Sequence, residues 1–198
     1  GEQLPRLPED FRNPYLRLPH GYDYDVANNE IFYQLTVEDG RVVAPSGTRY
    51  AYLAMPGVRY FSPEALRKLE ELADAGAQII VGQVPQGAFG LRDGADAESI
   101  RLGEELWNSG KLITGRPLRE VLTENVAPDF IGKDLGYIHR KAGEDDLYFV
   151  ANYASEPVER VCGFRITDRA PELWNPETGE IRALPNYTVK GEHTLIPM

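Results

Sequence analysis

The sequence predicts an α/β unit followed by an all-β segment. Through residues 41–125, short apolar runs alternate with amphipathic helical patterns, an order typical of a mostly parallel sheet covered by helices. After residue 128 the helical period disappears, and short runs bounded by turn residues follow one another, as in antiparallel sheets. We therefore expect an α/β domain over residues 1–128 and an antiparallel β-sandwich segment over residues 129–198.

The clearest element of the first half is a helix beginning after Ser62. Ser62 is a favoured N-cap residue and Pro63 suits the first helical position. Gly76 provides the stop signal at the other end. One face of this segment is apolar, as expected for a helix that covers a sheet; its members are Leu66, Leu69, Leu72 and Ala73.

The remaining elements of this half follow from apolar runs and helical spacing. Strands are expected at residues 41–44, 50–55, 77–82 and 111–114. A second helix is expected over residues 96–109 and a third around residues 117–125. In the second helix the spacing predicts that Ile100, Leu106 and Trp107 face the core.

In the second half, residues 135–140 and 147–153 flank a polar turn and predict a hairpin. Further strands are expected at residues 158–167, 180–184 and 194–196, with a turn at residues 175–179. The opening strand–helix unit of a doubly wound fold and the closing strand of a sandwich are both missing. We therefore expect the chain to be a piece of something longer.

Composition restricts the class of partner. The chain has 198 residues and a formal net charge of −10, with a pI near 4.8. This charge argues against nucleic acid and against membranes, since both favour a basic surface. Cys162 is the only cysteine, so neither an intrachain disulfide nor a cysteine zinc site can form.

The sequence carries no recognisable catalytic, cofactor or metal motif. The α/β half contains no cysteine and no Gly-x-Ser-x-Gly, and no phosphate-binding glycine pattern is present. The histidines are scattered, and His139 in its predicted strand suggests a hydrogen-bonded structural role. Glu144, Asp145 and Asp146 are interpreted as a solvated turn. We therefore expect no catalytic residue, no metal site and no cofactor.

Residues 21–32 are rich in carboxylates, amides and aromatic rings, and two interpretations remain open. If residues 22–27 form a strand, its end delivers Asn28, Asn29 and Glu30 to the rim where open α/β sheets bind ligands. These side chains either cap the end of that strand or contact a sugar. Tyr22 and Tyr24 are the candidate stacking platforms beside them.

Trp174 likewise has two interpretations, because it precedes the Asn-Pro turn at residues 175–176. Its ring either anchors that turn in the core or is an exposed platform for a sugar.

The order of several motifs resembles one family of enzymes. The motifs are Gly21-Tyr-Asp-Tyr-Asp-Val26 before Asn29-Glu30, the Ser62–Gly76 helix before Ile79-Ile-Val-Gly82, Tyr137–Arg140, Tyr148–Asn152 and Leu173–Glu180. Together they resemble the C-terminal region of bacterial glycoside hydrolases of the α-L-rhamnosidase type (family 106), over about residues 20–196. The resemblance implies a partial flavodoxin-like, class I amidotransferase-like three-layer unit followed by a β-sandwich segment.

The resemblance also implies a role. The family's catalytic carboxylates belong to a barrel outside this chain, so we expect a non-catalytic region, inactive alone, that packs against the barrel or shapes its sugar cleft. A stand-alone carbohydrate-binding module for plant-type polysaccharide or oligosaccharide is the alternative, and a small-molecule-binding α/β protein is a weaker third. The resemblance favours a periplasmic or secreted protein.

Overall fold

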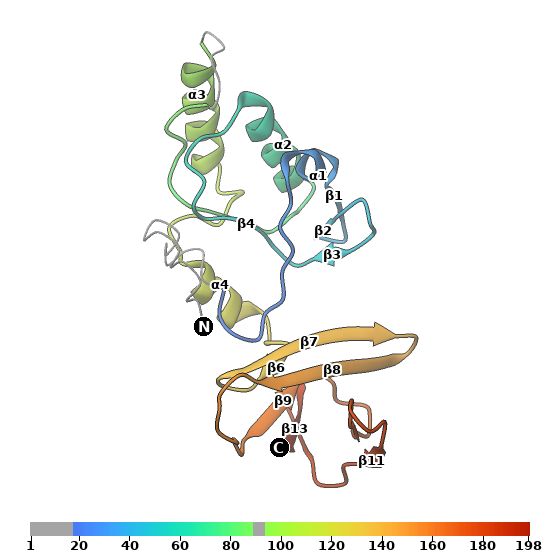
Figure 1. Ribbon diagram of the computed structural model, residues 1–198. Helices are drawn as coiled ribbons and strands as arrows, with labels where there is room; N and C mark the ends of the chain where they lie inside the picture. Colours follow the sequence, from blue (N-terminus) through green and yellow to red (C-terminus); the bar gives the residue numbers. More distant parts are fainter. Residues whose placement is uncertain (1–17, 89–93) are drawn as a thin grey trace. The chain divides into compact units, whose positions relative to one another are not determined.

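In the computed structural model, residues 18–88 and 94–198 are described (Figure 1). They form two compact units. The first contains Leu18 and residues 25–121, and the second contains Pro19–Tyr24 and Leu122–Met198. The described part of the chain is mostly β structure in several small antiparallel sheets with few helices. No helix within it has the length and hydropathy that crossing a membrane requires.

The first unit begins with a short helix and a meander. Helix α1 covers Asn29–Gln34 and leads into a three-stranded antiparallel sheet. Its strands, in both chain order and spatial order, are β1 (Thr36–Glu38), β2 (Arg41–Val43) and β3 (Arg49–Tyr50). The run at 41–44 is thus confirmed as a strand, whereas β1 and α1 were not foreseen.

A parallel pair of strands forms the centre of the first unit. Strand β4 (Leu53–Met55) pairs in parallel with β5 (Ile79–Val81), and helix α2 (Pro63–Asp74) connects them. All three residues of β5 are buried, as expected for a strand covered on both faces. The predicted strand at 50–55 is in fact two strands, β3 and β4, because the chain leaves one sheet and enters another.

Helix α2 agrees closely with its prediction. The Ser62 hydroxyl accepts a hydrogen bond from the backbone N–H of Ala65 at 3.1 Å, so the predicted N-cap is confirmed. The leucines of its apolar face are buried in the core of the unit; they are Leu66, Leu69 and Leu72. This core is the main source of the hydrophobic stabilisation of the first unit.

Helix α3 (Ala95–Asn108) departs from its prediction in one place. Leu106 and Trp107 are buried as expected, but Ile100 is exposed. Ser99 lies inward instead, where its hydroxyl donates a hydrogen bond to the backbone carbonyl of Phe61 at 2.7 Å. A satisfied hydroxyl can be buried at little cost, and hydrophobicity alone does not reveal that arrangement.

The predicted strand at 111–114 is reduced to a single parallel bridge between Ile80 and Ile113. Helix α4 (Leu118–Asn125) follows, as predicted, and the division between the two units falls within it.

The second unit contains a four-stranded sheet and a long hairpin. The sheet has the spatial order β12 (Thr188–Lys190), β13 (His193–Pro197), β9 (Val161–Phe164) and β6 (Phe130–Ile131). The hairpin pairs β7 (Leu135–Ala142) with β8 (Asp145–Asn152), as predicted, and a smaller hairpin pairs β10 (Glu172–Trp174) with β11 (Ile181–Ala183). No helix lies within residues 129–198.

The inner face of the β7–β8 hairpin packs on the sheet, giving two layers (Figure 1). The ring of Tyr137 stacks on Phe130 with centroids 4.9 Å apart, and Tyr148 meets Phe164 edge-on at 5.0 Å. Cys162 is fully buried within the same core. Offset and edge-on aromatic pairs of this kind stabilise a core beyond the area they bury.

A short segment from early in the chain completes the second unit. His20 Nε2 lies 2.7 Å from the carbonyl oxygen of Leu135, and the Tyr22 hydroxyl donates to the carbonyl of Val126 at 2.8 Å. Between them, Gly21 has a φ of 92°, and a Cβ there would lie 2.2 Å from the carbonyl oxygen of Phe130. Only glycine fits that backbone and that approach. No strand forms at 22–27, so the conditional expectation of one is wrong.

Candidate functional site

A buried polar cluster of the second unit is built around His139. Its Nδ1 lies 2.9 Å from Asp129 Oδ2, and its Nε2 lies 2.8 Å from Asp146 Oδ1. An ionised carboxylate only accepts hydrogen bonds, so both bonds form together when both ring nitrogens carry a proton. The two aspartate side chains are only 10% and 5% exposed. His139 is therefore a hydrogen-bonded structural residue, as its strand position predicted.

The register of the hairpin brings these groups together. His139 is the cross-strand partner of Tyr148, and the neighbouring pair is Lys141 with Asp146. Since side chains alternate along a strand, His139, Tyr148 and Asp146 all point to the inner face. Asp129 reaches the same place from the residue before β6, with its backbone N–H bonded to the Gly21 carbonyl.

Two arginines balance the buried carboxylates. Arg165 Nη2 donates to Asp129 Oδ1 at 3.1 Å, and Arg169 Nη1 lies 3.6 Å from Asp146 Oδ2. The hydroxyl of Tyr148 donates to the same Asp129 Oδ1, also at 3.1 Å. Buried charges persist in proteins when they are paired and hydrogen-bonded in this way.

Burial in the cluster changes the acidity of its tyrosines. Burial, with the Asp129 charge beside it, raises the pKa of Tyr137 to about 12. The pKa of Tyr148 is raised for the same reasons and by its hydrogen bond to Asp129. Both phenols therefore keep their protons to a higher pH than an exposed tyrosine does. The Tyr137 hydroxyl is buried without a hydrogen-bond partner among the described residues.

Sequence reasoning missed part of this cluster. Asp146 was interpreted as part of a solvated turn, which is wrong, because the turn is only Gly143-Glu144 and Asp146 belongs to β8. The useful signal was the alternation of Asp146, Tyr148 and Val150 opposite His139. Asp129 gave no local signal, since its partners lie 10 and more residues away.

The cluster is better suited to hold the two layers together than to perform catalysis. Glycoside hydrolysis requires two carboxyl groups that face a substrate across an open cleft. Asp129 and Asp146 instead face a histidine and two arginines in a closed interior. Across the described ranges, no group of three or more potential ligand side chains could hold a metal ion.

The predicted sugar-contact residues are divided between the two units. Asn28 is the N-cap of α1, and its Oδ1 accepts from the Ile31 N–H at 2.9 Å. Asn29 and Glu30 occupy the first turn of that helix and are exposed. Asn28 thus caps the start of a helix and not the end of the expected strand, and contact with a sugar stays a prediction for these three.

The two tyrosines of the same prediction belong to the second unit. The Tyr22 hydroxyl donates a hydrogen bond to the Val126 carbonyl, whereas Tyr24 is exposed. Their contact with a sugar also stays a prediction.

Trp174 is exposed on the β10–β11 hairpin. The interpretation that its ring anchors the turn in the core is therefore wrong. The turn is held by its own backbone and by Asn175, and the ring is not needed for it.

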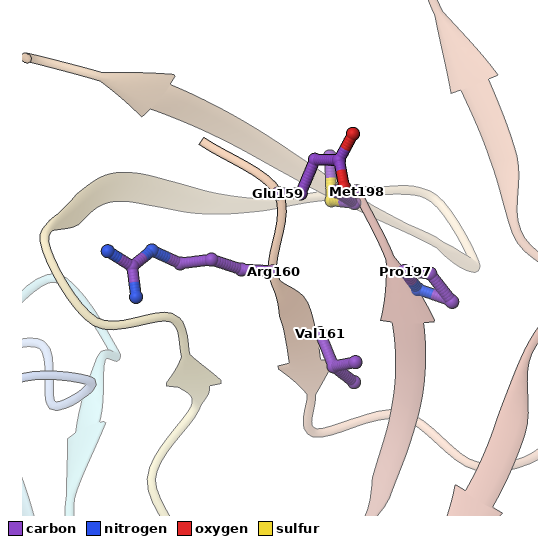
Figure 2. Close-up of a pocket in the computed structure, with 5 residues that line it drawn as sticks. All are labelled: Glu159, Arg160, Val161, Pro197 and Met198. Carbon is purple, nitrogen blue, oxygen red and sulfur yellow. The ribbon is translucent and has the colours of Figure 1, made fainter. Parts of the chain in front are cut away.

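A hollow of about 440 Å³ lies beside the first residue of β9 and the last residue of β13, which are paired with each other. Figure 2 shows its lining residues, with Val161 and Pro197 on the two neighbouring strands and the Arg160 side chain extending away from them. The others are Glu159 and Met198. The hollow is open, and the Arg160 guanidinium is engaged with Asp134 at 3.3 Å, so it offers no convergent set of polar groups.

Comparison with known proteins agrees with the motifs noted in the sequence. The family model for glycoside hydrolase 106, described as alpha-L-rhamnosidase, matches residues 8–189. A curated relative named "Putative beta-glucuronidase", from Formosa agariphila, is 34% identical over 169 residues, which is 82% of this chain. The chain spans about 14% of the length of that relative. This chain therefore belongs to the glycoside hydrolase 106 family.

Proposed function

We propose that this chain is a non-catalytic C-terminal region of a glycoside hydrolase, which packs against the catalytic barrel or shapes its sugar cleft. The observation that carries the proposal is the outer face of the β7–β8 hairpin. Ile138 and Phe149 are direct cross-strand partners there, and they are 51% and 57% exposed. Leu147 beside them is exposed as well.

An apolar strip of this kind is typical of a surface that another protein covers. The inner face of the same strands is already occupied by the His139 cluster and the aromatic core. The hairpin therefore has one face for its own unit and one for a neighbour. The catalytic barrel of the parent enzyme is the proposed neighbour.

The buried carboxylates of the chain support the non-catalytic part of the proposal. A general acid for glycoside hydrolysis must reach the leaving oxygen of a bound sugar. Asp129 and Asp146 have their oxygens engaged by His139 and arginines instead. The curated relative also has far more chain than this one, and the catalytic carboxylates are expected there.

The test is an assay of the purified chain with aryl α-L-rhamnosides and aryl β-glucuronides. We expect no turnover above that of the Asp129→Asn variant. Robust turnover that one carboxylate substitution abolishes would overturn the proposal. In the parent enzyme, Phe149→Ser should lower thermal stability or activity, while Val189→Ser on the exposed edge strand β12 serves as the matched control.

We infer that the first unit is part of a flavodoxin-like, class I amidotransferase-like three-layer unit. The parallel pairing of β4 with β5 through α2, and the parallel bridge from Ile80 to Ile113 beyond α3, support it. A crystal structure of the parent enzyme would test it, with an additional parallel strand expected beside β4.

A stand-alone carbohydrate-binding module is the second candidate. Exposed Tyr24 and Trp174 favour it, since tyrosine and tryptophan rings are enriched at binding interfaces. Calorimetry with plant-type oligosaccharides separates the two: a stand-alone module should bind them as tightly by itself as within the parent enzyme, whereas a region that shapes the barrel's cleft should bind them far more tightly within the parent enzyme.

A further inference from the structure

We propose that the β10–β11 hairpin carries a sugar-stacking subsite centred on Trp174, selective for neutral over anionic sugars. The inference rests on the glycoside hydrolase role proposed above and names one place where the chain would touch carbohydrate. It follows from the exposure of one ring, the hydrogen bonds that hold the ring and its turn, and the charge around it.

The Trp174 ring is exposed yet held in place. Its side chain is 57% exposed, and its indole N–H donates to Glu172 Oε2 at 3.1 Å. Glu172 lies two residues earlier on the same strand, so both side chains point to the same face. A ring fixed before the ligand arrives loses less entropy on binding than a free one.

The turn that follows the ring is closed by several hydrogen bonds. Asn175 Oδ1 accepts from the backbone N–H groups of Glu177 at 2.9 Å and Thr178 at 3.2 Å. The Asn175 N–H donates to the Glu180 carbonyl at 2.9 Å, and the Gly179 N–H donates to the Asn175 carbonyl at 2.8 Å. These bonds tie the end of β10 to the start of β11.

The cross-strand neighbour of the ring extends the apolar surface. Trp174 lies directly opposite Ile181, and Glu172 lies opposite Ala183. Residues opposite each other in an antiparallel pair share a face. Ile181 is 52% exposed. The face therefore presents an indole ring and an aliphatic side chain side by side, with a carboxylate at the edge of the ring.

This arrangement fits a pyranose ring. The C–H groups on one side of a pyranose are slightly positive and pack on the negative face of an indole. The sugar hydroxyls at the rim donate to acceptors, and the Glu172 carboxylate has lone pairs left after accepting from the indole. A purely apolar protein partner would leave that carboxylate desolvated and without a ligand donor.

The charge of the hairpin selects between sugars. Residues 172–183 contain three glutamates and a single arginine, and Arg182 lies opposite Leu173, on the other face from the ring. Like charges near a binding surface disfavour an anionic ligand. A neutral sugar such as rhamnose is therefore favoured over a uronic acid such as glucuronic acid.

The test is an NMR titration of the unmodified chain, labelled with ¹⁵N. The chain has two tryptophans, and Trp107 is buried with its indole N–H bonded to the Gly82 carbonyl at 3.0 Å. The spectrum thus contains one indole signal that reports the site and one that serves as an internal control. The probes are methyl α-L-rhamnopyranoside, a rhamnose disaccharide and methyl β-D-glucuronide.

We expect the Trp174 indole signal to shift saturably with the rhamnosides, the Trp107 signal to stay unmoved, and the glucuronide to bind about tenfold more weakly. Trp174→Ala should abolish the shifts of neighbouring backbone signals, and Trp174→Phe should keep part of the affinity. Because the ring is exposed, both variants should unfold at the same denaturant midpoint as the unmodified chain.

An unmoved Trp174 signal at about 50 mM rhamnoside, or shifts that persist in Trp174→Ala, would overturn the subsite. Tighter binding of the glucuronide would overturn the neutral-sugar selectivity. An unmoved Trp174 signal leaves the non-catalytic proposal intact, because the hydrolysis assay tests that proposal separately. Hydrolysis by the chain would refute the non-catalytic proposal and leave the binding result intact.

Discussion

The imidazole ring of His139 lies face to face on the phenol ring of Tyr148, with centroids 4.1 Å apart and planes inclined by 12°. Both rings bind the same carboxylate, His139 through Asp129 Oδ2 and Tyr148 through Asp129 Oδ1. One aspartate thus fixes two stacked rings on neighbouring strands. This arrangement determines how the second unit should respond to substitution.

Asp145 and Asp146 are adjacent in sequence but differ in burial, with side chains 86% and 5% exposed. Asp146→Asn leaves His139 and Arg169 without the charge they face. We expect a loss of about 3 kcal/mol in the free energy of unfolding. Asp145→Asn should change it by no more than about 0.5 kcal/mol. Urea denaturation followed by circular dichroism measures both, and equal effects would contradict the buried network.

Tyr137 and Tyr148 form a second matched pair. The Tyr148 hydroxyl donates to Asp129, whereas the Tyr137 hydroxyl is buried without a partner among the described residues. Tyr148→Phe should therefore lower stability by about 1.5 kcal/mol. Tyr137→Phe should be neutral or stabilising, because it removes a polar atom that is desolvated without compensation. The opposite order in thermal unfolding would refute the assigned contacts.

The alkaline response of the protein follows from the same two phenols. An ordinary tyrosine has a pKa near 10, and burial raises that of Tyr137 to about 12. Between these values the unfolded chain has lost the proton that the folded chain keeps. Stability from this group is thus complete below pH 10 and is lost as pH rises toward 12.

Absorbance at 295 nm should accordingly show late-titrating phenols in the folded protein and none in urea. Stability measured at increasing pH above 10 should fall less steeply in Tyr137→Phe. An identical fall in the variant would show that other groups cause the alkaline loss.

Cys162 provides a test of the core. Burial raises the pKa of its thiol and disfavours the reactive thiolate. Reaction with a thiol reagent should therefore be slow in the native protein and fast in denaturant. A native rate equal to that of free cysteine would show that the strand β9 opens far more readily than its packing implies.

Elements governed by local signals were predictable from the sequence. Helix α2 carries its cap, its first-turn proline and its leucine face within one segment, and the structure reproduces each. The β7–β8 hairpin was equally clear from its alternation. Family membership was visible in the order of motifs and is confirmed by the match over residues 8–189.

Features that depend on distant contacts were not predictable. Ser99 replaces Ile100 at the core because a carbonyl 38 residues away accepts its hydroxyl. Asp129 is hydrogen-bonded to a histidine, a tyrosine and an arginine that lie in three later segments of the chain. Trp174 lies outside, and its turn is closed by backbone hydrogen bonds and by the Asn175 side chain without the ring. Hydrophobicity and spacing contain none of this information.

The segment of residues 19–24 has a consequence for the order of folding during synthesis. His20 meets a carbonyl 115 residues further along the chain, and Tyr22 meets one 104 residues further along. When this segment leaves the ribosome, none of its partners has yet been made. The first unit can fold before the partners of this segment are made, but the second unit cannot complete its fold until its last strands have been synthesised. Any division of the chain for separate expression should therefore carry residues 19–24 with the C-terminal piece, despite their place near the N-terminus.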